Sequence, residues 1–496
     1  MTVIDNPGTV AARRGHLIPG HITAADAPVF ERRSPFDGSL VAEVVLGTPA
    51  DTRAAIAAAR NAFDHGPWPK LPGTERAKIL LRWAGLVREN AEELARLETA
   101  EVGKPIGFAR AGDVPATLDT IEAAALAAAH VKGELHDDLG GAIMGLVRRE
   151  PVGVVGAIVP WNFPALLYSH KVAFALAAGC TVVVKPSEFT SGSAILLTRL
   201  AHRAGVPEDA LVLVTGTGPD AGQPLAESTD VDLLSFTGST RTARLLAAVD
   251  RPYPQVQHFE LGGKGATIVF ADADLDQAVD GALFGFAINN GETCTAGTRL
   301  LVEDAIADEF VARLAQKAAQ LTVGDPWSES TVVGPLIHAQ HTARVRGFID
   351  EAAAAGSVVI SPELPASTSP ESFVAPTIID RVETDSRLFQ EEVFGPVLAV
   401  KRFSGVDEAV RLANSTVYGL ANSIWTSDTS TALTVARALK SGTVWINTIH
   451  DTPGTLPFGG VAGSGIGREK GVEGLVGFTQ LKTITVQVAP RSPIYG

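Results

Sequence analysis

One of the two cysteines in this chain lies in a setting that suits a reacting thiol. Cys294 belongs to NNGETCTAGTR (289–299), a run of Asn, Gly, Thr and Ala that follows an apolar, helix-like stretch. Backbone N–H groups and helix N-termini lower the pKa of a thiol from about 8.5, and glycines let a ligand approach the backbone. Taken alone, the stretch fits a nucleophile or a small apolar residue in a turn. Cys180 instead starts an apolar strand pattern, where burial keeps a thiol inert.

A carboxylate and an amide elsewhere in the chain offer complementary chemistry. Glu260 ends a strand-like run and opens ELGGK (260–264). A carboxylate that loses its water in such a place becomes a general base near neutral pH. Asn162, within PWNFP (160–164), offers an amide able to stabilise an oxyanion. Taken alone, Glu260 also fits an ordinary loop carboxylate, and PWNFP fits a turn fixed by its two prolines.

Three further segments have the residue types of a dinucleotide site. Lys185 and Glu188 in KPSE (185–188) can hydrogen-bond ribose hydroxyls. FTGST (236–240) leads from a strand into a helix, whose free N–H groups favour a phosphate. GTGPDAG (216–222) is glycine-rich but lacks the G-x-G-x-x-G spacing. Each also fits a plain turn, but all three, like PWNFP, follow strands of one predicted sheet, at the edge where such sheets bind ligands.

Two α/β series must position these side chains. The first alternates helical stretches with apolar runs, which are VGVVGAIVP (152–160), CTVVVKP (180–186), LVLVTG (211–216) and VDLLSFTG (231–238). Continuous apolar strands between helices predict a parallel sheet covered on both faces. A second alternation, from ATIVF (266–270) to GTVWIN (442–447), predicts another α/β domain.

The remaining segments carry weaker signals. Residues before about 40 show no regular pattern, Thr48 with Asp51 predicts a capped helix start, and one helix is expected from about Thr74 to Glu101. AIMGLVRRE (142–150) and LKTITVQV (481–488) are strand-like but have no obvious neighbour in their own domains. Unpaired strand edges invite pairing between subunits, so we expect a homodimer or homotetramer.

Composition bounds the function further. The 496 residues are 46% hydrophobic, enough for several large cores. Net charge is −14 with no basic cluster, so nucleic acid is not an expected partner. The strongest apolar run, VAFALAAGCTVVV (172–184), is too short to span a membrane, and no signal-peptide pattern stands out. Two cysteines make no disulfide framework, so we expect a reducing, cytoplasmic location.

Taken in order, the motifs resemble those of the aldehyde dehydrogenase superfamily, from about residue 30 to about 488. They are PWNFP, KPSE, FTGST, ELGGK, the cysteine segment, EEVFGPV (391–397), YGL (418–420), PFGG (457–460) and SGIGRE (464–469). The resemblance implies NAD(P)⁺-dependent oxidation of an aldehyde to an acid. It also implies a Rossmann-like parallel-sheet cofactor domain (1–129 and 149–262), a second α/β catalytic domain (263–476) and a small β oligomerisation segment (130–148 and 477–496).

The resemblance also implies roles for single residues, and no metal. Cys294 resembles the nucleophile, the Asn162 amide with the Cys294 N–H resembles the oxyanion hole, and Glu260 resembles the base that activates water. Lys171 and Glu469 match positions of a proton relay. The positions that match cofactor contacts are Ile158, Trp161, Lys185, Glu188, Gly218, Gly222, Phe236, Gly238, Ser239, Leu261, Glu392 and Phe394. The positions that match the aldehyde tunnel are Phe163, His170, Thr293, Thr295, Thr452 and Phe458.

Some positions depart from the commonest family pattern. Glu292 stands where Gln is frequent, and it can add charge near the thiol or face away. His170 stands where many members have Trp, and Thr452 where many have an aromatic residue. With Asp451 beside it, the tunnel mouth is expected to be polar and to favour small or medium aldehydes, although a purely structural His170 fits equally well. Glu188 predicts NAD⁺ over NADP⁺, because a 2′-phosphate would face a like charge.

Three alternatives remain open at this point. A thiol hydrolase would need a histidine paired with Cys294, and the 11 histidines show no such signature. A non-catalytic homologue would have no reason to hold Cys294, Glu260 and Asn162 together. A CoA-acylating semialdehyde dehydrogenase would typically lack Glu260. The sequence does not name the aldehyde.

Overall fold

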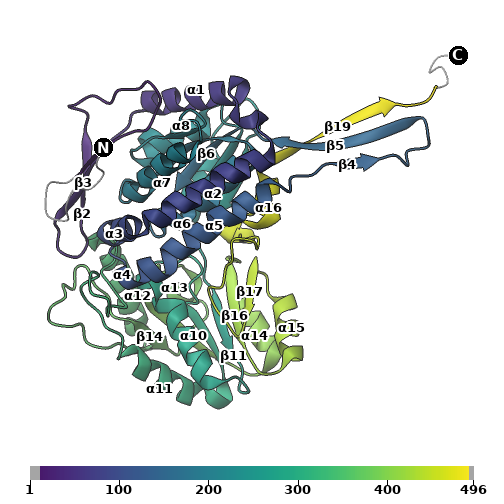
Figure 1. Ribbon diagram of the computed structural model, residues 1–496. Helices are drawn as coiled ribbons and strands as arrows, with labels where there is room; N and C mark the ends of the chain where they lie inside the picture. The colour runs from purple at the N-terminus through teal and green to yellow at the C-terminus, as the bar shows by residue number, and fades with distance from the viewer. Residues whose placement is uncertain (1–11, 491–496) are drawn as a thin grey trace.

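A six-stranded, mostly parallel sheet carries the segments that suit a dinucleotide. The computed structural model describes residues 12–490 (Figure 1), so residues 1–11 and 491–496 of the expected domains lie outside the described part. The strand order is β18-β10-β9-β6-β7-β8, and β18 alone is antiparallel to its neighbour. The bounds are β6 (Val154–Val159), β7 (Thr181–Pro186), β8 (Leu211–Leu213), β9 (Leu233–Thr237), β10 (Val256–Glu260) and β18 (Gly465–Ile466).

Helices cover both faces of this sheet, as the continuous apolar strands predict. Val182 and Val184 pack on one face with α2, α5, α6 and α7, and Val183 packs on the other with α1. Successive side chains of a strand point to opposite faces, so a strand covered on both must be apolar throughout. The bounds are α1 (Pro49–His65), α2 (Gly73–Glu89), α5 (Val114–Ala128), α6 (Pro164–Ala178), α7 (Ser191–Ala204), α8 (Gln223–Glu227) and α9 (Thr240–Ala247).

A seven-stranded sheet forms the lower lobe in Figure 1, which confirms the second α/β series. Its order is β13-β14-β15-β12-β11-β16-β17, parallel except for β13 with β14. The strands are β11 (Ala266–Val269), β12 (Arg299–Glu303), β13 (Val358–Ile360), β14 (Thr377–Asp380), β15 (Val397–Phe403), β16 (Ala421–Trp425) and β17 (Thr443–Ile446). The helices are α10 (Leu275–Ala287) and α11 (Ala307–Ala318) on one face, and α12 (Ala339–Ala354), α13 (Arg387–Gln390), α14 (Gly405–Ala413) and α15 (Thr429–Ala438) on the other.

A three-stranded arm leaves the body on the right of Figure 1. It consists of β4 (Glu134–His136), β5 (Ile143–Pro151) and β19 (Thr479–Gln487), in the order β19-β5-β4. The two strand-like segments of the sequence therefore pair with each other, which corrects the expectation that neither has a neighbour. Within residues 12–490, the outer edges of β4 and β19 have no partner strand.

Two other expectations were wrong. Residues 12–40 are not irregular throughout, because β1 (Ala12–Arg14), β2 (Val29–Arg33) and β3 (Leu40–Val45) form a small sheet. The expected helix from 74 to 101 is broken at Asn90, whose side chain donates to the Leu86 carbonyl at 2.7 Å, so α3 (Ala91–Val102) follows α2 as a separate helix. The capping box of Thr48 and Asp51 is confirmed. The short α4 (Ile106–Phe108) and α16 (Gly471–Gly477) complete the helices.

None of the described helices combines the length and apolar character needed to cross a membrane.

Candidate active site

The fold brings the three main candidates to one place between the two sheets. Asn162 follows β6, Glu260 ends β10, and Cys294 lies in the loop between α10 and β12. The backbone of ELGGK approaches the cysteine loop so closely that a Cβ on Gly263 would lie 2.3 Å from the Cys294 carbonyl oxygen. Only glycine fits at position 263, which explains this glycine of the ELGGK motif.

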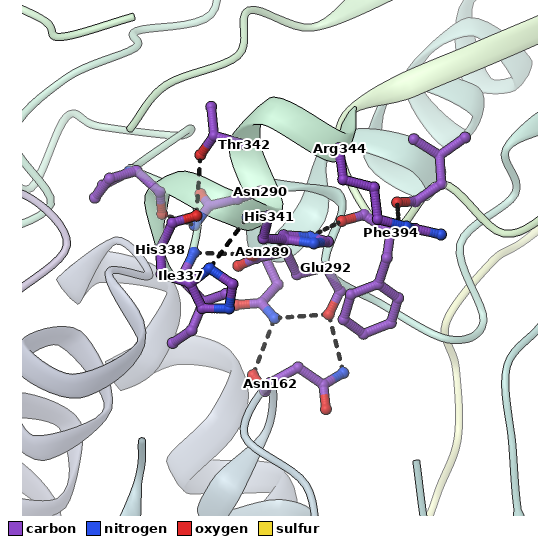
Figure 2. Close-up of polar contacts among 12 residues, drawn as sticks. Asn162, Asn289, Asn290, Glu292, Ile337, His338, His341, Thr342, Arg344 and Phe394 are labelled. Atoms are coloured by element: carbon purple, nitrogen blue, oxygen red, sulfur yellow. Dashed lines mark hydrogen bonds and ion pairs between the residues drawn. The ribbon is translucent and has the colours of Figure 1, made fainter. Parts of the chain in front are cut away.

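Two buried asparagines shape the loop that presents Cys294. Asn289 and Asn290 both adopt positive φ, 50° and 59°, and Gly291 follows at 72°. The Asn289 amide donates to the carbonyls of Asn162 and Glu292 at 3.0 and 3.2 Å (Figure 2). Asn tolerates this left-handed region because its side chain can satisfy nearby backbone groups. The NNG sequence before the cysteine is therefore a turn held in place by its own side chains.

The Asn162 amide is fixed by the same loop. Its Nδ2 donates to the Glu292 carbonyl at 2.9 Å, as Figure 2 shows. An amide nitrogen carries two N–H groups, so this bond orients Asn162 and leaves its second N–H for another acceptor.

Glu292 faces away from the thiol. Its side chain is buried, and its Oε1 accepts from the Ile337 N–H at 2.9 Å and lies 3.7 Å from His341 Nε2 (Figure 2). Burial raises the pKa of Glu292 well above its usual value. The residue thus ties the cysteine loop to the segment before α12 and does not add charge beside Cys294.

The two thiols differ in access. Cys294 keeps partial exposure, whereas Cys180 is buried and its Sγ donates to the Phe478 carbonyl at 3.3 Å. Burial raises the pKa of Cys180 to about 12. Burial, then Glu392 and Glu260, raise the pKa of Cys294 to about 12, and the backbone N–H groups that lower it only partly offset them. The Cys294 thiol of the free enzyme is therefore protonated at neutral pH.

Behind Glu260 lies a buried chain of charges. The Lys171 ammonium donates to Glu469 at 2.6 Å and to the Ser235 hydroxyl at 3.0 Å. Burial alone would raise the pKa of Glu469, but Lys171 and His170 outweigh it and the pKa falls to about 2. Burial and then the charge of Glu469 raise the pKa of Glu260 well above its usual value. The ionised form is therefore favoured at Glu469 and the protonated form at Glu260, so the two carboxyls differ in their tendency to hold a proton.

The expected ribose contacts lie together at the ends of β6 and β7. Lys185 Nζ is 3.4 Å from Glu188 Oε2. A Cβ on Gly222 would lie 3.6 Å from both the Ile158 side chain and the Lys185 side chain. Gly218 and Gly222 bound a single helical turn that is capped by Thr217. A buried Lys beside a half-buried Glu offers the donor and the acceptor that a ribose diol requires.

The expected phosphate positions continue along the same edge, and the expected nicotinamide positions Glu392 and Phe394 come from the loop between α13 and β15. Ser239 caps α9 through a bond from the Thr242 N–H, and the Phe236 ring closes over Gly238. Phe236 shares one buried apolar cluster with Ile158 and Leu261. Glu392 accepts from the Gly263 N–H at 3.0 Å, and the Phe394 ring meets that of Trp161 edge-on at 5.3 Å. Burial raises the pKa of Glu392 to about 7.

Comparison with known proteins decides the family. The model of the aldehyde dehydrogenase family matches residues 22–484. The chain belongs to the aldehyde dehydrogenase family. It is 41% identical over 488 residues to the NADP/NAD-dependent aldehyde dehydrogenase PuuC of Escherichia coli (strain K12), with 98% of each chain covered. It is also 41% identical over 463 residues to betaine aldehyde dehydrogenase of Bacillus subtilis (strain 168), and this match covers 92% of this chain and 94% of the relative.

Solved structures agree. The NAD-dependent aldehyde dehydrogenase from Sinorhizobium meliloti superposes with a TM-score of 0.95 at 41% identity, covering 98% of this chain and 97% of the other. The fold class expected from the sequence is confirmed. The chain is thus an enzyme, an NAD(P)-dependent aldehyde dehydrogenase. This finding disfavours the alternative of a non-catalytic homologue.

The residues expected to line the aldehyde tunnel come from several elements, and only Thr293 and Thr295 belong to the cysteine loop. Thr295 Oγ1 lies 3.2 Å from His450 Nδ1, and Thr293 Oγ1 donates back to the Ile288 carbonyl at 3.3 Å. Phe163 is half-buried, and the Lys104 ammonium lies 4.5 Å from its ring centroid. The Thr452 carbonyl accepts from Lys470 at 2.5 Å. Asp451 is exposed beside it.

Two residues of α12 were missed by sequence reasoning. His341 Nε2 lies 2.7 Å from the Phe394 carbonyl, and Arg344 donates to the carbonyls of Glu392 and Val393, both at 2.7 Å. Phe394 itself has φ of 61°, a conformation that needs such support in a non-glycine residue. No motif surrounds His341 or Arg344, and only the fold brings α12 to this loop.

One cluster outside the site has the residue types of a metal ligand set. His16, His21 and Asp51 offer ligand atoms within 4.8 Å of one another. The Nδ1 of His16, however, accepts from the Thr215 N–H at 3.1 Å, so its Nε2 carries the proton and points a donor at the cluster. Asp51 is also engaged in the helix cap. The cluster therefore acts as hydrogen-bonded support for α1.

Proposed function

We propose that this aldehyde dehydrogenase works through a covalent cysteine intermediate, hydrolyses it to the free acid, and prefers NAD⁺. The observation that supports this most is the convergence of a half-exposed thiol, a fixed amide and a buried carboxyl in Cys294, Asn162 and Glu260. A thiol hydrolase is less well supported. The histidine contact in this loop falls on Thr295, and within residues 12–490 no hydrogen bond joins a histidine to the Cys294 sulfur.

In the first step, the Cys294 thiol gives its proton to water, and its sulfur adds to the carbonyl carbon of the aldehyde. An S–C bond forms, and the C=O electron pair moves to oxygen. The free N–H of Asn162 and the backbone N–H of Cys294 can donate to that oxyanion, and such donors typically contribute 10²–10³-fold. When bound, NAD⁺ supplies the hydride acceptor that converts this adduct to a thioester.

In the second step, Glu260 acts as base. It takes a proton from water, whose oxygen bonds to the acyl carbon, and the C–S bond breaks to release Cys294 as a thiolate and the product as an acid. Lys171 and Glu469 are proposed to pass the proton onward, because Glu469 is close enough to raise the pKa of Glu260 and is itself paired with Lys171.

The residues present fit the cofactor. Lys185 and Glu188 would hold the adenosine ribose, and Glu392 the nicotinamide ribose. The Ser239 N–H at the start of α9 would hold the pyrophosphate, and Gly238 would let it approach, since the Gly238 N–H itself donates to the Glu260 carbonyl at 3.1 Å. The side chains of Lys185 and Glu188 suit ribose hydroxyls, and the start of α9 suits a phosphate. Both lie at the carboxyl ends of parallel strands, where such sheets bind ligands. The proposed domain division remains a cofactor domain (1–129 and 149–262), a catalytic domain (263–476) and oligomerisation strands (130–148 and 477–496). Two free thiols would suit a reducing cytoplasm.

The direct test is absorbance at 340 nm with NAD⁺ and a panel of short aliphatic, aromatic, ω-amino and semialdehyde substrates. We expect NADH and free acid in equal amounts, and kcat/KM across the panel ranks the substrates. A long-chain aldehyde that outranks every short polar one would contradict the polar tunnel mouth. The proposal as a whole fails if the panel gives no NADH.

Cofactor choice gives a separate prediction. We expect kcat/KM for NAD⁺ to exceed that for NADP⁺ at least tenfold, because Glu188 would oppose a 2′-phosphate at a cost of several kcal/mol. Glu188→Ser should lower the ratio by improving NADP⁺ use. The control is Glu92→Ser, which removes an exposed carboxylate distant in sequence from Glu188. Equal efficiency of both cofactors in the wild type would refute the preference.

The arm predicts self-association. We propose that β19 pairs with another subunit, because its outer edge has no partner strand within residues 12–490 and its faces carry exposed apolar side chains such as Leu481, 60% exposed. Light scattering should give about two or four times the 51.7 kDa chain mass. Leu481→Asp should shift the protein toward the monomer, whereas Leu433→Asp, an exposed leucine on α15, should not. A monomeric wild type at working concentration would contradict this.

A further inference from the structure

His170 presents a buried nitrogen that the proposed chemistry does not use. His170 lies on α6, the helix that follows Asn162, and is 4% exposed. Its Nδ1 lies 3.3 Å from Glu469 Oε2, but its Nε2 has no hydrogen-bond partner among residues 12–490. Buried polar atoms are nearly always partnered, so the open Nε2 is free to take a hydrogen bond from water or from a bound molecule.

Glu469 fixes which nitrogen of His170 carries the proton. The carboxylate stays ionised because Lys171 donates to its other oxygen at 2.6 Å. An ionised carboxylate only accepts hydrogen bonds, so Nδ1 of His170 must be the N–H that donates to it. Burial lowers the pKa of His170 to about 4, so the ring is neutral at physiological pH. Its lone pair is therefore on Nε2, and Nε2 can only accept.

The face of α6 that carries His170 is also the one with partly exposed side chains, next to Asn162. Positions 163, 166 and 170 share one face at helical spacing. Phe163 and Leu166 are half-buried, whereas every other residue of α6 is buried. The Phe458 ring meets the His170 ring edge-on, with centroids 6.1 Å apart. His170 thus lies one to two turns deeper along the partly exposed face that begins beside Asn162, with the Phe458 ring against it.

We propose that His170 is a specificity-determining residue whose Nε2 accepts a hydrogen bond from a hydroxyl group of the substrate. This inference rests on the proposed function and adds the substrate class, which is hydroxyaldehydes. A neutral donor is favoured over an ammonium, because the ammonium groups of Lys171 and Lys470 already act on the His170 ring. Lys470 Nζ also lies 5.8 Å from the centroid of the Phe458 ring.

The test compares matched aldehydes in which a hydroxyl replaces a methyl group of similar size. The pairs are 3-hydroxypropanal with butanal, and 4-(hydroxymethyl)benzaldehyde with 4-ethylbenzaldehyde. The measured quantity is the ratio of kcat/KM within each pair, and comparing it between enzymes cancels the hydration of each aldehyde. We expect His170→Phe to lower the ratio about tenfold for at least one pair, mainly by slowing the hydroxyl member.

His170→Asn keeps a side-chain acceptor and should restore part of the ratio. An unchanged ratio in His170→Phe would overturn the proposal. So would an equal loss for both members of each pair, which would make His170 a part of the proton relay. Should the variants not fold, the wild type decides: after correction for hydration, a ratio of one or less for both pairs contradicts the proposal. A wild type that forms no NADH with any aldehyde would instead count against the proposed function.

Discussion

Replacing Cys294 by alanine should lower aldehyde oxidation by about 10⁴-fold or more, because no other group near the site can form the covalent adduct. Asn162 and Glu260 would still surround the substrate but would have no acyl group to act on. The measurement is NADH formation at 340 nm with saturating NAD⁺. Cys180→Ala is the matched control, since its buried sulfur bonds the Phe478 carbonyl and should affect stability without affecting chemistry.

Chemical labelling separates the two thiols further. Iodoacetamide should inactivate the enzyme with the label on Cys294, and NAD⁺ with a slow substrate should protect it. Burial and the carboxyls of Glu392 and Glu260 raise the pKa of Cys294 to about 12, and only the thiolate reacts. The labelling rate of the free enzyme should therefore keep rising with pH beyond the usual range for a thiol. Label on Cys180 with activity lost, or activity retained in Cys294→Ala, would remove Cys294 from the nucleophile role.

The parts of the site that could be predicted are those whose requirements are local. In ELGGK, a Cβ on Gly263 would collide with the Cys294 carbonyl, and one on Gly262 would lie 2.3 Å from a Glu392 oxygen. Such close approaches demand glycine, so they leave a mark in the sequence. The capping box of Thr48 and Asp51 and the apolar strands of the first sheet are local in the same sense.

Contacts between distant segments leave no such mark. His341 and Arg344 support the loop of Glu392 and Phe394, but any polar side chain of the right length could donate to those carbonyls. Whether Glu292 faced the thiol depended on the Ile337 N–H, far along the chain. The small sheet of β1 to β3 was missed for a similar reason, because short strands are stabilised by their partners more than by their own pattern.

Glu260→Gln separates the two chemical steps. Burial and the nearby charge of Glu469 raise the pKa of the Glu260 carboxyl, and an amide of the same shape adds no charge to the core. The variant should therefore fold and bind normally. Adduct formation precedes the step that needs a base, so stopped-flow absorbance at 340 nm should show a burst of about one NADH per active subunit. Steady turnover should then fall by about 10²–10⁴-fold, the usual contribution of a general base.

The pH dependence sharpens the same prediction. Glu260 must lose its proton to act, and its pKa is raised, so hydrolysis in the wild type should speed up as pH rises toward that pKa. Glu260→Gln has no such group, and its slow turnover should lack this rise. Absence of both burst and turnover would move Glu260 to an earlier step, the activation of Cys294. Preferential formation of acyl-CoA by the wild type, when CoA is added, would show that a thiol and not water takes the acyl group.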